Sequence, residues 1–189
     1  LYQLSEVANE YFQDQLWNSE EGQNIGLSYF RERDLRDDVV KQFQLGYSPK
    51  GRDAFTQFAF GKGYKKEILE QSGLSIFRED SDQGFDRFRE RVIFPIHSFS
   101  GRVLGFGGRI LQNNAKVAKY LNSPENEIYH KSQILYGLFQ AKSQITKEDN
   151  CYLVEGYMDV VSLYQRGITN VVASSGTALT TDQIRLIRR

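Results

Sequence analysis

The last forty residues constrain the fold most, because two short apolar runs alternate there with two helical patterns. Residues 151–154 and 170–173 predict buried strands, and residues 156–166 and 181–188 predict helices. Strand, helix, strand and helix joined by short connections are typical of a parallel α/β sheet. We therefore expect a parallel α/β unit in this part of the chain.

Glu155 is the strongest single candidate for chemistry. It follows the first predicted strand and precedes Gly156, which puts its carboxylate at the carboxyl edge of the sheet, where such folds bind ligands. Residues 174–177 follow the second strand at the same edge. Asp159 lies one helical turn beyond Glu155, which allows both acids to face one site. Carboxylates next to a basic groove suit Mg²⁺-assisted phosphoryl transfer.

A structural role for the two acids stays open on spacing alone. Glu155 would then interact with the helix macrodipole, and Asp159 would be a solvated acid of the first helical turn.

The first 86 residues predict an acidic helical lobe. Apolar side chains recur every three or four positions over 1–21, and the helical stripe stops near Gly22. A short helix starts at Asp37 and is followed by Gly46 as a stop signal, and two more helices are predicted near 52–60 and 64–72. This lobe has 10 basic and 16 acidic residues.

The pattern then changes to strands. Two β-rich runs, up to His97 and from Arg102, flank a short turn that contains glycine, which predicts a hairpin. At the start of this hairpin Arg87, Arg89 and Arg91 recur at every second position, against Phe88 and Val92 on the other, mostly apolar face. Because side chains alternate along a strand, this spacing predicts a row of charge on one face.

Charge is concentrated in the middle of the chain. The 24 basic and 24 acidic residues of the whole chain cancel, but residues 87–131 have 8 basic and 3 acidic residues. Salt screens charges over about 8 to 10 Å, so a local excess can still attract a polyanion. The basic residues are Arg87, Arg89, Arg91, Arg102, Arg109, Lys116, Lys119 and Lys131, with Phe88, Phe99, Phe106 and Tyr120 between them.

Single-stranded nucleic acid fits this composition. Arginine pairs with phosphate oxygens, and aromatic rings stack on unpaired bases. A merely solvated face is the alternative, and the one-sided arginine row favours binding. The glycine-rich segment 105–109 has two open interpretations, a close approach of phosphate or a glycine-kinked strand. We expect His97 to be a structural residue at a strand end.

The cysteine count and the hydropathy of the chain indicate the cellular compartment of the protein. The single cysteine, Cys151, excludes an internal disulfide and a Cys-based zinc site in this chain. No stretch approaches the roughly 18 to 20 apolar residues of a membrane span, and no signal peptide is evident. We expect a soluble cytoplasmic protein. The chain starts at Leu1 without Met, so we also expect a fragment.

Six segments together resemble the catalytic core of bacterial-type DNA primase, in its order. They are residues 87–96 (RFRERVIFPI), 101–109 (GRVLGFGGR), 119–125 (KYLNSPE), 130–131 (HK), 135–138 (LYGL) and 154–161 (VEGYMDVV). The resemblance covers residues 1–189 and is weakest in the first 80.

The resemblance implies a mixed α+β and α/β fold. Residues 1–148 would form an N-terminal subdomain with helices and a β-rich basic face that holds template, and residues 149–189 the first part of a Toprim fold. It also implies an enzyme, a DNA primase that synthesises short RNA primers on single-stranded DNA.

The resemblance assigns roles to individual residues. Glu155 would be the catalytic acid and a metal ligand, and Asp159 a nearby member of the acidic cluster. Arg87, Arg89, Arg91 and Arg109 would line the template and nucleotide cleft, with Lys119, Tyr120 and Lys131 near the incoming triphosphate or the template backbone.

Cofactors and partners follow from the same resemblance. Mg²⁺ is implied, with the remaining Toprim aspartates beyond Arg189, and Zn²⁺ only in a separate N-terminal domain. Single-stranded DNA, nucleoside triphosphates (NTPs) and the primer–template hybrid would bind this core, and a replicative helicase would bind a separate C-terminal domain. We expect a monomer with no membrane contact, and no primer synthesis by residues 1–189 alone.

Two alternatives stay open. One is another Toprim enzyme, such as a primase-helicase, a topoisomerase or a nuclease, although the segments 87–96 and 119–125 argue against the last two. The other is a non-catalytic module that binds single-stranded nucleic acid and has lost its metal chemistry.

Overall fold

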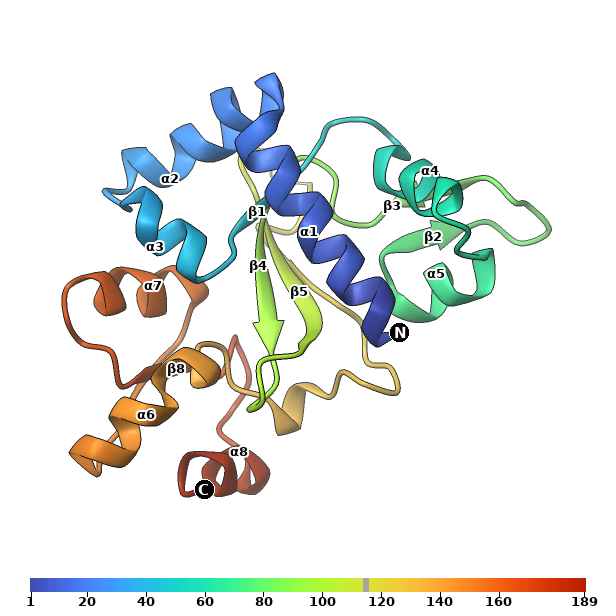
Figure 1. Ribbon diagram of the computed structural model, residues 1–189. Helices are drawn as coiled ribbons and strands as arrows, with labels where there is room; N and C mark the ends of the chain where they lie inside the picture. Colours follow the sequence, from blue (N-terminus) through green and yellow to red (C-terminus); the bar gives the residue numbers. More distant parts are fainter. Residues whose placement is uncertain (114–115) are drawn as a thin grey trace.

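The chain folds around a four-stranded antiparallel sheet with helices on its sides (Figure 1). The computed structural model describes residues 1–113 and 116–189. The strand order is β1 (Gly46–Ser48), β4 (Arg91–His97), β5 (Val103–Ile110) and β6 (Tyr120–Asn122). The predicted hairpin is confirmed, because β4 and β5 pair antiparallel from Arg91 opposite Ile110 to His97 opposite Val103.

The predicted row of arginines on one strand face is wrong. Strand β4 begins only at Arg91, and residues 87–90 form a turn. Arg91 is itself buried, with 4% of its surface exposed. The same spacing of charged and apolar residues is compatible with a turn that buries one aromatic ring. In this turn the buried ring is that of Phe88, which is 1% exposed.

Helix α1 (Tyr2–Asn18) packs across β1 and β5 through the apolar stripe seen in the sequence (Figure 1). Helix α1 ends at Asn18, a few residues before the predicted stop near Gly22, but helical backbone then resumes as a π-helix (Gly22–Leu27) and α2 (Ser28–Glu32), which the sequence did not predict. A Cβ at Gly22 would lie 1.7 Å from the carbonyl oxygen of Gln15. The glycine therefore permits a close approach instead of ending the helical path.

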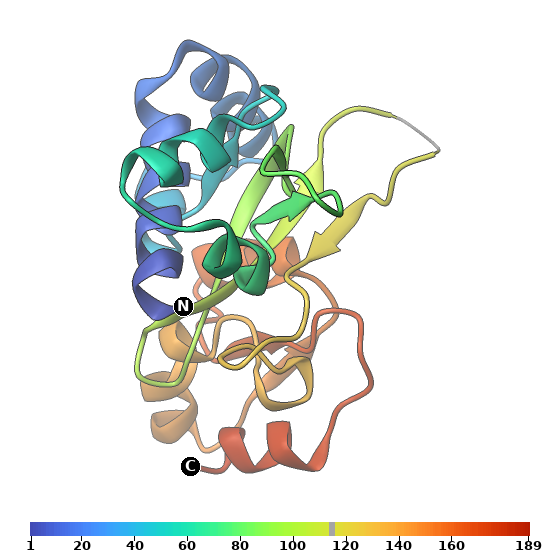
Figure 2. The ribbon, with the colours of Figure 1, turned by 90° about the vertical axis from the view of Figure 1, so that its right-hand side faces the viewer.

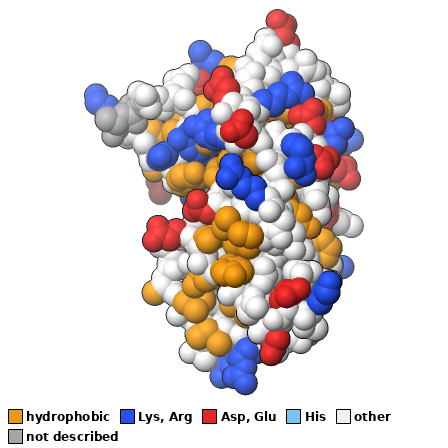
Figure 3. Space-filling view, turned by 90° about the vertical axis from the view of Figure 1, so that its left-hand side faces the viewer, with side chains coloured by type: hydrophobic (Ala, Val, Ile, Leu, Met, Phe, Trp, Pro, Cys, Tyr) orange, Lys and Arg blue, Asp and Glu red, His pale blue; other side chains and the backbone are white. Residues whose placement is uncertain are grey.

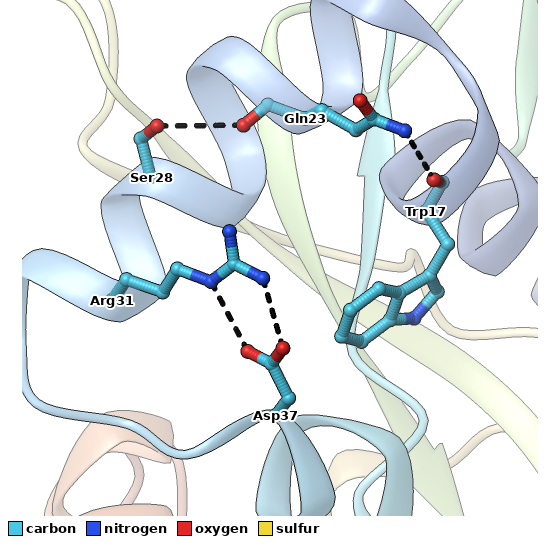
Figure 4. Close-up of polar contacts among 5 residues, drawn as sticks. All are labelled: Trp17, Gln23, Ser28, Arg31 and Asp37. Carbon is cyan, nitrogen blue, oxygen red and sulfur yellow. Dashed lines mark hydrogen bonds and ion pairs between the residues drawn. The ribbon is translucent and has the colours of Figure 1, made fainter.

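Polar contacts fix the turn from this π-helix into α3 (Asp37–Gln42) (Figure 4). The Gln23 Nε2 atom donates to the carbonyl oxygen of Trp17 at 2.6 Å. Arg31 donates to both carboxylate oxygens of Asp37 at 3.1 and 2.8 Å. These contacts tie the π-helix to α1 and α2 to α3.

A small two-stranded sheet lies on the other side of α1 from α2 and α3 (Figure 1). It consists of β2 (Ser75–Phe77) and β3 (Gly84–Asp86), and it packs against the two predicted helices, α4 (Ala54–Gly61) and α5 (Lys66–Ser72). The buried carboxylate of Asp86 accepts hydrogen bonds from the backbone N–H groups of Phe55 and Thr56 and from the Thr56 hydroxyl, at 2.7 to 2.9 Å.

The predicted parallel unit is confirmed and lies below the four-stranded sheet in both ribbon views (Figures 1 and 2). Strands β7 (Tyr152–Val154) and β8 (Val171–Ala173) pair in parallel across α7 (Tyr157–Gln165), and α8 (Thr181–Ile187) follows. The predicted burial of the first strand is wrong, since Tyr152 is 57% and Leu153 45% exposed. Among the described strands β7 pairs only with β8, so one edge of β7 has no strand next to it.

The helix predicted over 133–145 lies later in the chain, as α6 (Leu138–Glu148) after a 3-10 turn (Lys131–Gln133). Gly137 has a φ of +85°, which breaks the helical path before Leu138. Helix α6 packs against β8, and Tyr136 bridges to Ala173 of β8. The boundary after residue 148 stays a prediction.

One apolar core crosses from the sheet into the parallel unit. It joins Phe43 and Phe94 to Tyr136, Tyr157 and Val160. Side-chain packing therefore fixes the position of the parallel unit relative to strand β4. No helix in the described part of the chain is long and apolar enough to cross a membrane.

His97 is structural, as predicted. It is buried, and its Nε2 atom lies 2.8 Å from Gln44 Oε1, which also accepts a hydrogen bond from Asn9 Nδ2. An amide oxygen only accepts, so Nε2 carries the proton of a neutral imidazole. Burial lowers the pKa of His97 to about 4.

We expect His97 to make stability depend on pH between about 6.5 and 4. The unfolded chain binds a proton in this window that the folded chain does not, so the free energy of unfolding falls as the pH falls. The slope from this residue reaches about 1.4 kcal/mol per pH unit. Urea unfolding of wild type and His97→Gln measures it, and equal slopes for the two proteins would refute this assignment.

Candidate nucleic-acid and nucleotide site

A pocket of about 350 Å³ lies where β6 faces the carboxyl ends of β7 and β8. One wall is formed by Tyr120 and Asn122. The other wall is formed by Glu155, Gly156, Tyr157, Asp159, Ser175 and Gly176. The structure thus brings together three residues that the sequence predicted for the site, namely Tyr120, Glu155 and Asp159.

The two acids of the pocket have different surroundings. The Asp159 Oδ2 atom accepts a hydrogen bond from the backbone N–H of Gly156 at 3.2 Å. Asp159 therefore caps the start of α7, a role that the sequence had left open for Glu155. Glu155 is exposed, and its carboxylate has no hydrogen bond or ion pair to another described residue. Its oxygens are free to bind a ligand.

The carboxylates of the pocket are suitable ligands for Mg²⁺, but they make up only part of a ligand set. Carboxylate oxygens are the ligands that Mg²⁺ prefers. Within residues 1–113 and 116–189, however, no three His, Cys, Asp or Glu side chains come close enough to hold a metal. Glu155 is the residue we would assign as a protein ligand.

Tyr157 forms the rigid floor of the pocket. Its ring stacks on Phe94 at 5.2 Å between centroids and 14° between planes, and it meets the edge of Tyr136 at 4.7 Å. A Cβ at Gly107 of β5 would lie 2.4 Å from this ring. Burial raises the pKa of Tyr157 to about 12, so its hydroxyl is a proton donor at neutral pH.

The glycines of β5 make room for side chains of this protein. Gly105 faces Tyr129, Gly107 faces Tyr157, and Gly108 faces Phe88 and Arg91. Strand β5 continues through all of them. The proposed phosphate approach at 105–109 is therefore wrong, because aromatic rings already occupy that space.

Arg109 lies between two tyrosines next to the pocket. Its guanidinium is 5.1 Å from the centroid of Tyr29 and 5.9 Å from that of Tyr120. The guanidinium of Arg33 lies 3.6 Å from the centroid of the same Tyr29 ring. Cation–π contacts of this kind hold guanidinium groups in place.

Sequence reasoning missed Tyr29 and Arg33. Tyr29 lies in the first turn of α2 and Arg33 directly follows this helix, in a lobe that has six more acidic than basic residues. Burial raises the pKa of Tyr29, and Arg109 and Arg33 oppose that rise. Tyr29 and Arg33 are four residues apart, and this helical spacing is the one signal in the sequence that indicated a shared face.

Arg87 and Arg91 direct their guanidinium groups at backbone carbonyls. Arg91 donates to the carbonyl oxygens of Gly108, Lys119 and Ala118 at 3.1, 3.2 and 2.9 Å. Arg87 donates to that of Asn122 at 3.3 Å from Nε and 2.9 Å from Nη2. The two arginines thus hold the segment that leads into and through β6. A role for them in contacting template stays a prediction.

The other predicted basic residues are spread more widely. Arg89 lies in the turn before β4, with a long ion pair of 3.9 Å to Glu90. Lys119 is exposed and lines an open hollow with Arg109. Lys131 lines a small pocket that shares Asn122 and Ser175 with the main one. Arg102 stacks on Tyr2, at the start of α1.

The surface on the α2 and α7 side of the molecule reflects this distribution (Figure 3). Lys and Arg side chains gather in the upper half of that face, mixed with several acids, and hydrophobic side chains gather in the lower half. Positive charge on this face is therefore local and not uniform.

The fold and the pocket define a class of protein. A mixed α+β lobe with a cationic and aromatic surface leads into a parallel unit with an acid at a strand end, which is the arrangement of a Toprim-type nucleic-acid enzyme. The family described as "DNA primase catalytic core, N-terminal domain" matches residues 11–142, and the "Toprim-like" family matches residues 152–189. The chain belongs to the DNA primase family.

Curated relatives agree over the whole chain. It is 40% identical over 189 residues to the DNA primase of Halalkalibacterium halodurans and 41% identical over 189 residues to that of Escherichia coli strain K12. All of this chain is aligned in both cases, but only 31% and 32% of the relatives. The chain spans about a third of the length of the curated relatives it matches.

Solved structures agree as well. The primase catalytic core of E. coli has a TM-score of 0.90 and 40% identity, with 100% of this chain and 59% of that chain covered. A primase catalytic domain bound to single-stranded DNA has a TM-score of 0.88 and 40% identity, with 98% and 56% covered. The RNA polymerase domain of Mycobacterium tuberculosis primase, with a double-stranded DNA that has a 6-nucleotide overhang, has a TM-score of 0.89 and 34% identity, with 100% and 58% covered.

We expect the charge of Arg109 to contribute to DNA binding. Arg109→Ala should weaken binding of single-stranded DNA and reduce the slope of log affinity against log salt by about 1, because it removes one phosphate contact. Arg109→Lys is the matched control, since it keeps the charge and should leave the slope unchanged. A salt titration of fluorescent DNA measures both. An unchanged slope for Arg109→Ala would remove this residue from the nucleic-acid site.

Proposed function

We propose that this chain forms the template-binding lobe and the beginning of the catalytic unit of a primase. The complete protein would synthesise short RNA primers on single-stranded DNA. It would act on NTPs as a cytoplasmic monomer, with a replicative helicase as partner. The observation that supports this most is the pocket in which Glu155 faces Tyr120, with Arg109 next to it.

The chain's own residues would bind and orient the substrates. Arg109, held between Tyr29 and Tyr120, would bind a backbone phosphate of the template or the triphosphate. The exposed ring of Tyr120 would stack on a base. Lys119 and Lys131 would add positive charge on either side of the pocket.

Glu155 would hold a Mg²⁺ ion through its free carboxylate. When bound, such an ion stabilises the charge that develops on a transferring phosphoryl group. Asp159 would act mainly by capping α7, which fixes the backbone next to Glu155. Residues 1–189 supply only part of an oxygen ligand set, so we expect no primer synthesis from them alone.

Glu155→Gln in the full-length protein should reduce primer synthesis by at least about a thousandfold. The substitution removes the charge that a metal needs but keeps the shape of the side chain. Affinity for single-stranded DNA should stay within about twofold, because the phosphate contacts are elsewhere. Incorporation of labelled nucleotides on a single-stranded template measures the effect, with Glu127→Gln, an exposed acid outside the pocket, as control.

Wild-type synthesis by the Glu155→Gln protein would refute the catalytic role. It would favour the alternative of a module that binds single-stranded nucleic acid without metal chemistry.

A further inference from the structure

Asn122 is held from two directions at the pocket wall. Arg87 donates twice to its carbonyl oxygen, at 3.3 and 2.9 Å. The hydroxyl of Tyr157 donates to its side-chain Oδ1 at 2.6 Å. Asn122 of β6 is therefore bound through its backbone to Arg87, in the turn before β4, and through its side chain to Tyr157, at the start of α7.

The Tyr157–Asn122 hydrogen bond connects the two walls of the pocket. Among the described residues it is the one hydrogen bond between β6 and residues 149–189. Tyr157 lies two residues after Glu155, and Asn122 lies two residues after Tyr120. Ser175, in the loop after β8, lines the same pocket as Tyr157.

This arrangement also fixes which way the Asn122 amide points. Its Oδ1 accepts from Tyr157, so its Nδ2 is left as a donor. That nitrogen has no hydrogen-bond partner among the described residues, and Asn122 lines the pocket. The donor is therefore available to an oxygen atom of a bound ligand.

We propose that Tyr157 and Arg87 are positioning residues that act through Asn122. They hold the Asn122 amide so that its Nδ2 donates to an oxygen of the incoming nucleoside triphosphate, opposite Glu155. This inference rests on the proposed function, because it takes the pocket as the nucleotide site.

Removing one hydroxyl tests the connection. In the full-length protein, Tyr157→Phe keeps the ring packing on Phe94 and should weaken binding of a fluorescent ATP analogue in Mg²⁺ by about 5- to 10-fold, the worth of one hydrogen bond. Tyr136→Phe is the matched control, since this buried hydroxyl has no partner among the described residues. The control should bind nucleotide as wild type does.

A double-mutant cycle shows whether Tyr157 acts through Asn122. Asn122→Ala should weaken nucleotide binding at least as much as Tyr157→Phe, and the double variant should be no weaker than Asn122→Ala alone. The KM for NTP should rise in parallel, with the affinity for single-stranded DNA within about twofold of wild type. Additive losses, or wild-type binding by Tyr157→Phe, would overturn the proposal.

Arg87→Lys separates positioning from direct phosphate binding. Lysine keeps the charge but loses the planar fork that reaches the carbonyl oxygen of Asn122. Positioning predicts a loss of nucleotide affinity with an unchanged salt slope for DNA. Retained nucleotide affinity would remove Arg87 from the proposal. A wild-type protein that binds no nucleotide would overturn the proposed function too, whereas wild-type binding with insensitive variants overturns this inference alone.

Discussion

The packing of the Tyr157 ring on β5 holds the rest of the site together. The ring fits only because position 107 has no side chain, and it stacks on Phe94 of the neighbouring strand. Tyr157 starts α7, so the same contact places the end of β7 next to the four-stranded sheet. A larger residue at Gly107 would push the two halves of the pocket apart.

This contact explains why charges far apart in the sequence act at one place. Glu155 lies next to the buried ring, and Tyr120 and Arg109 lie on the strands that the ring covers. The buried guanidinium of Arg91 donates to the backbone carbonyls of Ala118 and Lys119 and so holds the segment that leads into β6. Local positive charge, and not the net charge of zero, is then the quantity that matters for binding a polyanion.

Much of the fold could be predicted from the sequence, because the hairpin and the parallel unit have strong local patterns. The co-location of Glu155 with Tyr120 followed only from the resemblance, because no local pattern marks residues 120–122 as a strand. The orientation of Arg91 could not be predicted, since alternation does not show whether a guanidinium meets solvent or a carbonyl. The contribution of Arg33 was hidden for a different reason, because its partner ring, Tyr29, comes from a lobe with an excess of acids.

Metal-directed cleavage of the backbone tests the central claim, that the pocket between β6 and Glu155 is the catalytic centre. Fe²⁺ would replace Mg²⁺ in the full-length protein, and ascorbate with peroxide would generate hydroxyl radicals next to the bound ion. The account predicts cuts close to residues 120–122, 155–159 and 174–176, and their loss in Glu155→Gln. Cleavage that leaves these three segments intact in the wild-type protein would contradict it.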